Sequence, residues 1–252
     1  MGSVDGRVAL ITGGESGIGL ATARLLVERG AHVHLVGVDH EALRAAGKEL
    51  GPERSAVSVA DVTSAAQVRA AVGEALDRFG RLDVVFSNAG IAGDIAGIED
   101  YSEDVFRRVL DVHVVGTFLL LKHTLPHLSR GGSVIINSSV VGLTGEPAIS
   151  GYAAAKHAQV GLMRVAALEV AARGIRVNSI HPGPTDTPFQ RAVETAATGL
   201  SEVKAFEAFN SMIPLGRHAT PEEIARTVFY LASDDSEFTT GATLAVDGGM
   251  TI

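Results

Sequence analysis

Short runs of β-branched and aliphatic residues alternate with longer helical stretches along almost the whole 252-residue chain, and this alternation limits the fold most. The runs are apolar throughout rather than at every second position, which is typical of strands buried on both faces of a parallel sheet. They cover residues 8–11, 32–36, 56–59, 84–86, 134–136, 176–180 and 243–246.

Helical patterns fill most of the spaces between these runs, over residues 18–29, 65–79, 105–128, 152–172 and 221–232. Thr220-Pro221-Glu222-Glu223 marks one helix start, with an N-cap, a proline and acidic first-turn residues. Right-handed crossovers between parallel strands then predict a single α/β domain over residues 1–252, a Rossmann-like doubly wound sheet of about seven strands with helices on both faces. Residues 188–214 are helix-prone but lie outside this rhythm, so we expect a lid or substrate loop there.

The composition excludes several classes of function. The net charge is −8 and no run of Lys or Arg forms a basic stripe, so we expect no nucleic-acid partner. The chain has no cysteine, which excludes disulfides and thiolate zinc sites. No apolar run approaches the roughly 18–20 residues of a membrane span, and no signal peptide is visible, so we expect no membrane partner and a cytoplasmic protein.

The first run leads into a glycine-rich turn, Thr12-Gly13-Gly14-Glu15-Ser16-Gly17-Ile18-Gly19. Glycines permit a tight strand-to-helix turn and let a phosphate approach the helix N-terminus, where free N–H groups favour anions. The spacing G-x-x-x-G-x-G differs from the G-x-G-x-x-G of many dinucleotide folds. The strand before the turn and the helix after it nevertheless favour a nucleotide site.

Tyr152 and Lys156 lie one helical turn apart on one helix face. A nearby ammonium stabilises a phenolate and moves the phenol pKa down from its ordinary value of about 10. Ser139 follows the strand at 134–136 and is expected at its carboxyl end, beside a substrate carbonyl. A surface Tyr and Lys without function is the alternative interpretation of this pair alone.

These elements together resemble the short-chain dehydrogenase/reductase family, and the resemblance spans essentially the whole chain. The matching motifs are the Thr12–Gly19 turn, Asp61-Val62, Asn88-Ala89-Gly90, Ser139, Tyr152-x-x-x-Lys156, Asn178, Pro182-Gly183 with Thr187, and Asp247-Gly248-Gly249. The resemblance implies an NAD(P)-dependent oxidoreductase that interconverts a ketone and a secondary alcohol by hydride transfer, without a metal. It also implies a homodimer or homotetramer.

The resemblance also implies roles for individual residues. Tyr152 would be the general acid or base, Ser139 would bind the substrate oxygen, and Lys156 would lower the pKa of Tyr152 and bind the nicotinamide ribose. Asp61 and Val62 would contact the adenine. The expected cofactor-binding residues also include the acidic Glu15 and Asp39. The full set is Gly13, Glu15, Ser16, Gly17, Ile18, Gly19, Asp39, Asp61, Val62, Asn88, Ala89, Gly90, Tyr152, Lys156, Pro182, Gly183, Thr185 and Thr187. For Asn88 a structural role that ties strands together is equally open.

Two histidine features need separate interpretation. His113 stands in Asp111-Val112-His113-Val114-Val115-Gly116, where the family usually has an Asn that binds a water linked to the lysine. We expect His113 to maintain this proton relay as a fourth catalytic residue, because an imidazole binds water and titrates near neutrality; packing is the alternative. His123 and His127 form an H-x-x-x-H pair without a third ligand, so we expect no metal.

The cofactor preference depends on the end of the second strand. The family's NAD-selecting Asp usually falls where Gly37 stands, and its NADP-selecting Arg where Val38 stands. With Glu15 and Asp39 nearby, a phosphate dianion would be poorly compensated, so we expect NAD(H) to be preferred over NADP(H), with Asp39 as the discriminator. In the alternative, His40 or Arg44 binds the phosphate of NADP.

The expected substrate pocket is mostly apolar and favours a hydrophobic or aryl ketone or alcohol. Its candidate residues are Val140, Val141, Leu143, Glu146, Phe189, Phe206, Phe209 and Met212. One rival interpretation is a 3-oxoacyl-acyl-carrier-protein-type reductase, which needs a basic docking patch; Arg107-Arg108 is the candidate. The other is a catalytically weak nucleotide-sensing regulator, against which the intact Ser139, Tyr152 and Lys156 argue.

Overall fold

The computed structural model describes residues 2–252, and its strands form one seven-stranded sheet in the order β3-β2-β1-β4-β5-β6-β7. Every neighbouring pair is parallel. The strands are β1 (Val8–Thr12), β2 (His32–Gly37), β3 (Ser55–Val59), β4 (Leu82–Ser87), β5 (Leu128–Asn137), β6 (Arg176–Pro182) and β7 (Thr243–Val246). Each of the seven predicted runs lies within one of these strands, so the predicted doubly wound parallel sheet is confirmed.

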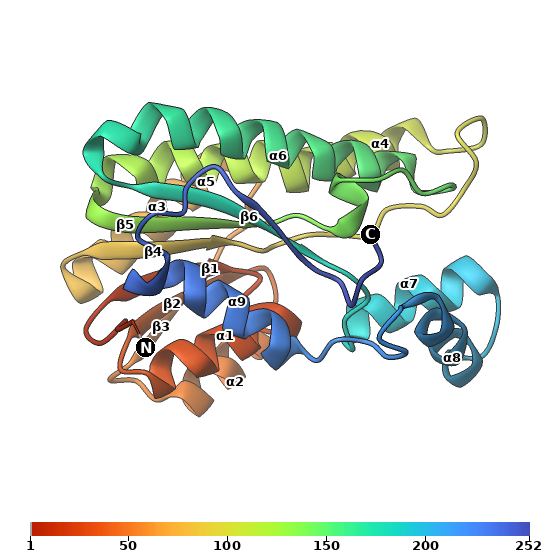
Figure 1. Cartoon of the computed structure of the whole chain (residues 1–252). Coiled ribbons are helices and arrows are strands. Elements are labelled where there is room, and N and C mark those ends of the chain that lie inside the picture. The colour runs from red at the N-terminus through yellow and green to blue at the C-terminus, as the bar shows by residue number, and fades with distance from the viewer. Residues whose placement is uncertain (1) are drawn as a thin grey trace.

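Helices cover both faces of this sheet, as Figure 1 shows. They are α1 (Gly17–Glu28), α2 (His40–Leu50), α3 (Ala65–Phe79), α4 (Glu103–Leu110), α5 (Gly116–Thr124), α6 (Ser150–Val170), α7 (Pro188–Thr198), α8 (Glu202–Met212) and α9 (Pro221–Ala232). One hydrophobic core joins α3, α5 and α6 to the sheet, and a second joins α1, α2 and α9 to its other face. The predicted cap at Thr220 is present as a full capping box with Glu223.

The single helix expected over residues 105–128 is wrong in detail. It is interrupted by a π-helical turn, η1 (Asp111–Val115), and α5 ends at Thr124 in a 3₁₀ turn, Leu125–His127. Pro126 explains the end, because it has no N–H to donate and its ring clashes with the preceding helical turn. Leu128 already belongs to β5. The π turn places His113 on its inner side, where it is 1% exposed.

The strand order reverses between β1 and β4, the place where doubly wound sheets bind ligands at the carboxyl ends of their strands. Helices α7 and α8 lie beyond that edge, away from the layered body of the molecule (Figure 1). They account for the segment that does not fit the strand–helix rhythm. Within residues 2–252, no helix combines the length and the apolar character needed to cross a bilayer.

Candidate active site

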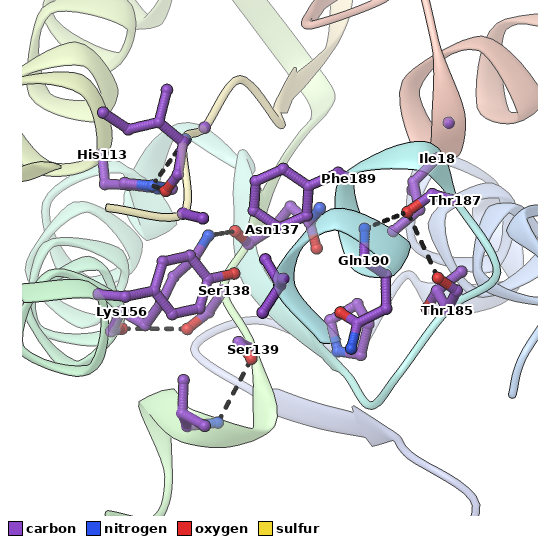
Figure 2. A pocket seen from close by; sticks show the side chains of 18 of the residues that line it. Ile18, His113, Asn137, Ser138, Ser139, Lys156, Thr185, Thr187, Phe189 and Gln190 are labelled. Atoms are coloured by element: carbon purple, nitrogen blue, oxygen red, sulfur yellow. Dashed lines mark hydrogen bonds between the residues drawn. The ribbon is translucent and has the colours of Figure 1, made fainter. Parts of the chain in front are cut away.

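A cleft of about 700 Å³ opens at the carboxyl edge of the sheet, a size suited to a cofactor and a small substrate. All four expected catalytic residues line it: His113, Ser139, Tyr152 and Lys156. Figure 2 shows Ser139 and Lys156 on one side of this pocket and Thr187, Phe189 and Gln190 of the α7 region on the other. The expected cofactor residues that line it are Gly13, Glu15, Ser16, Gly17, Ile18, Asp61, Val62, Asn88, Ala89, Gly90, Pro182, Gly183, Thr185 and Thr187.

The glycine turn brings backbone close to backbone at the start of α1. Gly13 and Gly17 have φ values of 61° and 50°, which favour glycine, and a Cβ at Gly19 would lie 2.0 Å from the Gly13 carbonyl oxygen. Gly19 therefore packs the turn and does not line the cleft. The N-cap of α1, Ser16, makes no side-chain cap hydrogen bond, and the first turn has no acidic residue. The N–H groups at this helix end are thus available to an anion.

Thr12 and Asn88 connect the glycine turn to the neighbouring strands. The Thr12 hydroxyl accepts the N–H groups of Asn88 and Ala89 at 3.0 and 3.1 Å. The Asn88 amide donates to the carbonyls of Thr12 and Gly13 at 3.1 and 3.0 Å, and its oxygen accepts from Asn137 at 2.8 Å. Because both ends of the amide have protein partners, the structure favours the structural role of Asn88.

Ser139 and Tyr152 come together from the end of β5 and the first turn of α6. A hydrogen bond from Ser139 lowers the pKa of Tyr152, but burial outweighs it and raises that pKa to about 12. The Ser139 backbone is fixed by His181, whose Nδ1 lies 2.7 Å from the Ser139 carbonyl oxygen. Because a carbonyl only accepts, this nitrogen is the donor. Sequence reasoning missed His181, although its place just before Pro182-Gly183 at a strand end was a usable signal.

Lys156 lies below Tyr152, with Nζ 5.2 Å from the centre of the phenol ring. It donates to the Asn137 carbonyl at 2.7 Å, and burial lowers its pKa to about 7. The Ser138 hydroxyl donates to the Lys156 carbonyl at 3.0 Å and so ties α6 to β5, a contact that the sequence did not suggest. Lys156 does not contribute the expected lowering of the Tyr152 pKa, which is governed by burial and the Ser139 hydrogen bond, and burial lowers the pKa of the amine itself.

His113 packs its ring edge-to-face against Tyr152, with centroids 5.3 Å apart. Its Nε2 lies 2.8 Å from the Ile91 carbonyl oxygen and 3.1 Å from the Ile91 nitrogen, while Nδ1 is buried and has no partner among the residues that the structure describes. A Cβ at Gly90 would lie 2.4 Å from the ring, so glycine is required there. Burial, with a smaller effect of Lys156, lowers the pKa of His113 to about 3. The imidazole is therefore neutral near pH 7, which does not fit a role that needs it charged.

The remaining expected contacts line the other parts of the cleft. Asp61 accepts the N–H and the hydroxyl of Thr63 at 2.9 and 2.8 Å, and these bonds lower its pKa. Thr187 caps α7 by accepting the Gln190 N–H at 3.2 Å and donates to the Thr185 carbonyl at 3.3 Å. A Cβ at Gly17 would lie 3.3 Å from the Thr187 methyl group, so this segment meets the glycine turn.

These residues fit a nicotinamide dinucleotide. The close-packed glycine turn and the uncapped start of α1 are what a pyrophosphate requires, and Glu15, whose buried Oε2 has no partner within residues 2–252, offers an acceptor to a ribose. The glycine turn and α1 would hold the phosphates, and Lys156 and Tyr152 would hold the nicotinamide half.

The expectation that Asp39 binds the cofactor needs correction, because Asp39 does not line the cleft. Its carboxylate caps α2 by accepting the Ala42 N–H at 3.0 Å, and the side chain faces solvent. It stands two positions beyond the end of β2, where the chain has already turned into the helix. Gly37 and Val38 do line the cleft at this end.

The substrate side of the cleft is mostly apolar, as expected, but two of its expected members lie elsewhere. Phe206 stacks on His218 with centroids 4.0 Å apart, and Leu143 does not reach the cleft wall. The expected Val140, Val141, Glu146, Phe189, Phe209 and Met212 line it, joined by Ile91, Ala92, Ile95, Thr144, Gln190, Val193 and Ala197, which sequence reasoning missed. The segment after β4 could have been inferred, since it leaves the carboxyl edge of the sheet.

Residues 188–214, the expected lid, are joined to the following loop by a buried polar pair. Glu194 of α7 and His218 lie 2.6 Å apart and are 1% and 2% exposed. Asn210 of α8 accepts both the backbone N–H and the Nδ1–H of His218, at 2.8 and 2.7 Å. The two lid helices are thereby joined to the loop that leads into α9. Across residues 2–252, no three His, Asp or Glu side chains gather in a way that could bind a metal ion.

Several known proteins are similar to this chain in sequence and in structure. A family model described as enoyl-(acyl carrier protein) reductase matches residues 13–251. The chain is 40% identical to cyclohexanol dehydrogenase of Acinetobacter sp. (strain SE19), covering 98% of this chain and 96% of the relative. It is 43% identical to cis-4-hydroxycyclohexanecarboxylate dehydrogenase of Sinomonas cyclohexanicum, covering 97% and 96%. The crystal structure of levodione reductase superimposes with a TM-score of 0.94 at 39% identity, covering 98% of each chain.

Proposed function

Because the chain belongs to the short-chain dehydrogenase/reductase family and is an oxidoreductase that interconverts secondary alcohols and ketones, we propose that it acts on ring-borne hydroxyl and keto groups of apolar alicyclic compounds. The observation that carries this proposal is the mostly apolar wall of the cleft that Ser139 and Tyr152 also line. Ile91, Val193 and Phe209 belong to that wall, which suits a hydrocarbon ring and offers few partners to a polyol.

In the proposed mechanism, the substrate oxygen lies between the hydroxyls of Ser139 and Tyr152. A bound nicotinamide dinucleotide supplies the hydride chemistry. In alcohol oxidation the phenolate of Tyr152 takes the hydroxyl proton, and in ketone reduction the phenol returns it. Lys156, fixed by the Asn137 carbonyl, lies 5.2 Å from the centre of the ring, where its protonated form stabilises the phenolate. His113 would take part as a neutral hydrogen-bonding group.

NAD(H) is the proposed preferred cofactor, with NADP(H) as the alternative. Among the described residues, Arg108 and Lys156 are the cations that line the cleft, and Arg108 lies 3.4 Å from Asp61. The pairing of Arg107 with Glu103 and Asp104, at 3.0 and 3.5 Å, weakens the acyl-carrier-protein alternative, because these acids neutralise the candidate docking patch.

The experiment is a comparison of initial rates with cyclohexanol, a linear secondary alcohol and a sugar alcohol, each with NAD and with NADP. We expect the highest kcat/KM for cyclohexanol with NAD. A higher value for the sugar alcohol would contradict the substrate class, and a higher value with NADP would contradict the cofactor preference.

We also propose that residues 188–214 close over the substrate and that the chain forms a homodimer or homotetramer. Phe189, Val193 and Phe209 of α7 and α8 support the first proposal, because they form part of the cleft wall. Phe118 on α5 and Leu168 on α6, which are 47% and 82% exposed, support the second. Hydrogen exchange with and without cyclohexanol and NADH tests the lid, and light scattering tests the assembly.

A further inference from the structure

Glu15 of the glycine turn lies against the backbone at the end of β2. A Cβ built at Gly37 would be 2.4 Å from both carboxylate oxygens of Glu15. The φ of Gly37 is not in the left-handed region, so the close approach of Glu15, and not the backbone conformation, requires glycine here. The Glu15 carboxylate therefore occupies the space in which a side chain at position 37 would begin.

The Glu15 carboxylate is partly buried and has unused hydrogen-bonding capacity. Oε2 is inaccessible and has no hydrogen-bond partner in the described protein. Burial raises the pKa of Glu15, while its own N–H and that of Val38 favour the charged form. A buried acceptor without a donor is costly, and because Glu15 lines the cleft, a small rotation of its carboxylate would let a ligand hydroxyl supply the missing donor.

Other charged groups near this end of the cleft are already engaged. Asp39 caps α2, as described above. His40 and Arg44, the candidates for binding a phosphate, lie 3.3 and 3.0 Å from Glu41. Among the described residues, none of these three lines the cleft, whereas Glu15 does.

We propose that Glu15 selects NAD over NADP by accepting the 2′-hydroxyl of the adenosine ribose, in place of the side chain that position 37 lacks. In dinucleotide-binding βαβ units an acidic residue at the end of the second strand, about 20 residues past the glycine turn, binds this hydroxyl. Here the carboxylate reaches the same place from the turn itself. The inference rests on the proposed function, because it concerns the cofactor of that site.

The proposal makes Glu15 and Gly37 a complementary pair. An acidic side chain at 37 and the carboxylate of Glu15 exclude each other, because both need the same space and carry like charges. A 2′-phosphate at this place would meet the Glu15 carboxylate, while His40 and Arg44 do not line the cleft, and repulsion then gives the selectivity.

The test is titration of the whole protein with NADH and with NADPH, followed by the fluorescence of the reduced cofactor, without substrate. Glu15→Gln keeps the shape and removes the charge, and Glu15→Ser is a second variant in case the first is unstable. Asp39→Asn is the matched control, because it removes an acidic charge nearby while Asn caps a helix as well as Asp. The double variant Glu15→Ser/Gly37→Asp moves the carboxylate back to β2.

We expect the parent to bind NADH more tightly than NADPH, and Glu15→Gln and Glu15→Ser to reduce that ratio about tenfold or more. Asp39→Asn leaves the ratio within about twofold of the parent, and the double variant restores the preference for NADH. A parental ratio in both Glu15 variants, or an equal loss in Asp39→Asn, would overturn the inference. Failure of the parent to bind either cofactor would overturn both this inference and the proposed function, whereas selective binding without turnover of any secondary alcohol would overturn the proposed function alone.

Discussion

At the catalytic end of the cleft, where Ser139, Tyr152 and Lys156 meet, burial shifts the pKa of Tyr152, and Ser138 and Lys156 are bonded to backbone atoms of α6 and β5. At the opposite end, which we call the adenosine end (Glu15, Gly37 and Asp61), charged groups lie on loops at the ends of β1, β2 and β3. Burial therefore controls the chemistry of the first end, and loop geometry controls that of the second. We expect changes at the catalytic end to alter turnover, and changes at the adenosine end to alter cofactor choice.

The largest effect is expected for Tyr152→Phe. Removal of the transferable proton should lower kcat about 10²–10⁴-fold, because this is the contribution of general acid–base catalysis. The affinities for NADH and NADPH, measured by fluorescence titration, should keep their ratio. Rates within about tenfold of the parent would exclude Tyr152 as the acid or base.

The pH dependence separates the two directions of the reaction. With the pKa of Tyr152 at about 12, the phenolate fraction rises about tenfold per pH unit through the neutral range. The kcat/KM for alcohol oxidation should rise with pH, whereas that for ketone reduction should not, because the phenol is already fully protonated. Oxidation rates that are flat between about pH 6 and about pH 9 would show that Tyr152 titrates lower than its burial indicates.

His113 should affect both activity and stability. His113→Asn should keep most activity and His113→Leu should lose much of it, as steady-state rates will show. Equal activity of the Leu variant would mean that His113 serves only in packing.

The pKa of His113 is near 6.5 in the unfolded chain and about 3 in the folded protein. The free energy of unfolding therefore falls as the pH is lowered through this window. Between about pH 7 and about pH 5, the free energy of unfolding should fall by about 1–2 kcal/mol less in His113→Asn than in the parent.

The smallest effect is expected at Asp39. Asp39→Ala should lower the free energy of unfolding by about 1 kcal/mol, because the cap of α2 is lost. Asp39→Asn should leave it unchanged, since Asn caps equally well, and neither variant should alter the ratio of NADH to NADPH affinity. Urea unfolding measures the first effect. An altered ratio of NADH to NADPH affinity in both variants would show that Asp39 does select the cofactor.

The sequence predicts the catalytic end better than the adenosine end, for a physical reason. Tyr152 and Lys156 share a regular helix, and Ser139 follows directly after β5, so spacing determines where they lie. Glu15 and Asp39 lie on turns, where spacing does not give the direction of a side chain, and Asp39 was assigned to the ribose although it caps α2.

The sequence motifs also do not show how deeply the catalytic side chains are buried. Enclosure raises the pKa of Tyr152 and lowers those of Lys156 and His113, and it depends on side chains from several elements. The Glu194–His218 pair and the His181 contact with Ser139 likewise join segments far apart in the chain, so no local pattern indicates which residues are the partners.

Transfer of deuterium from the alcohol carbon to NAD tests most directly whether the protein moves a hydride from a ring carbon. Cyclohexanol carrying deuterium at its carbinol carbon is incubated with the parent protein and NAD, and the products are examined by mass spectrometry. We expect cyclohexanone and reduced NAD that carries the deuterium. Turnover of no secondary alcohol, or reduced cofactor without deuterium, would contradict it.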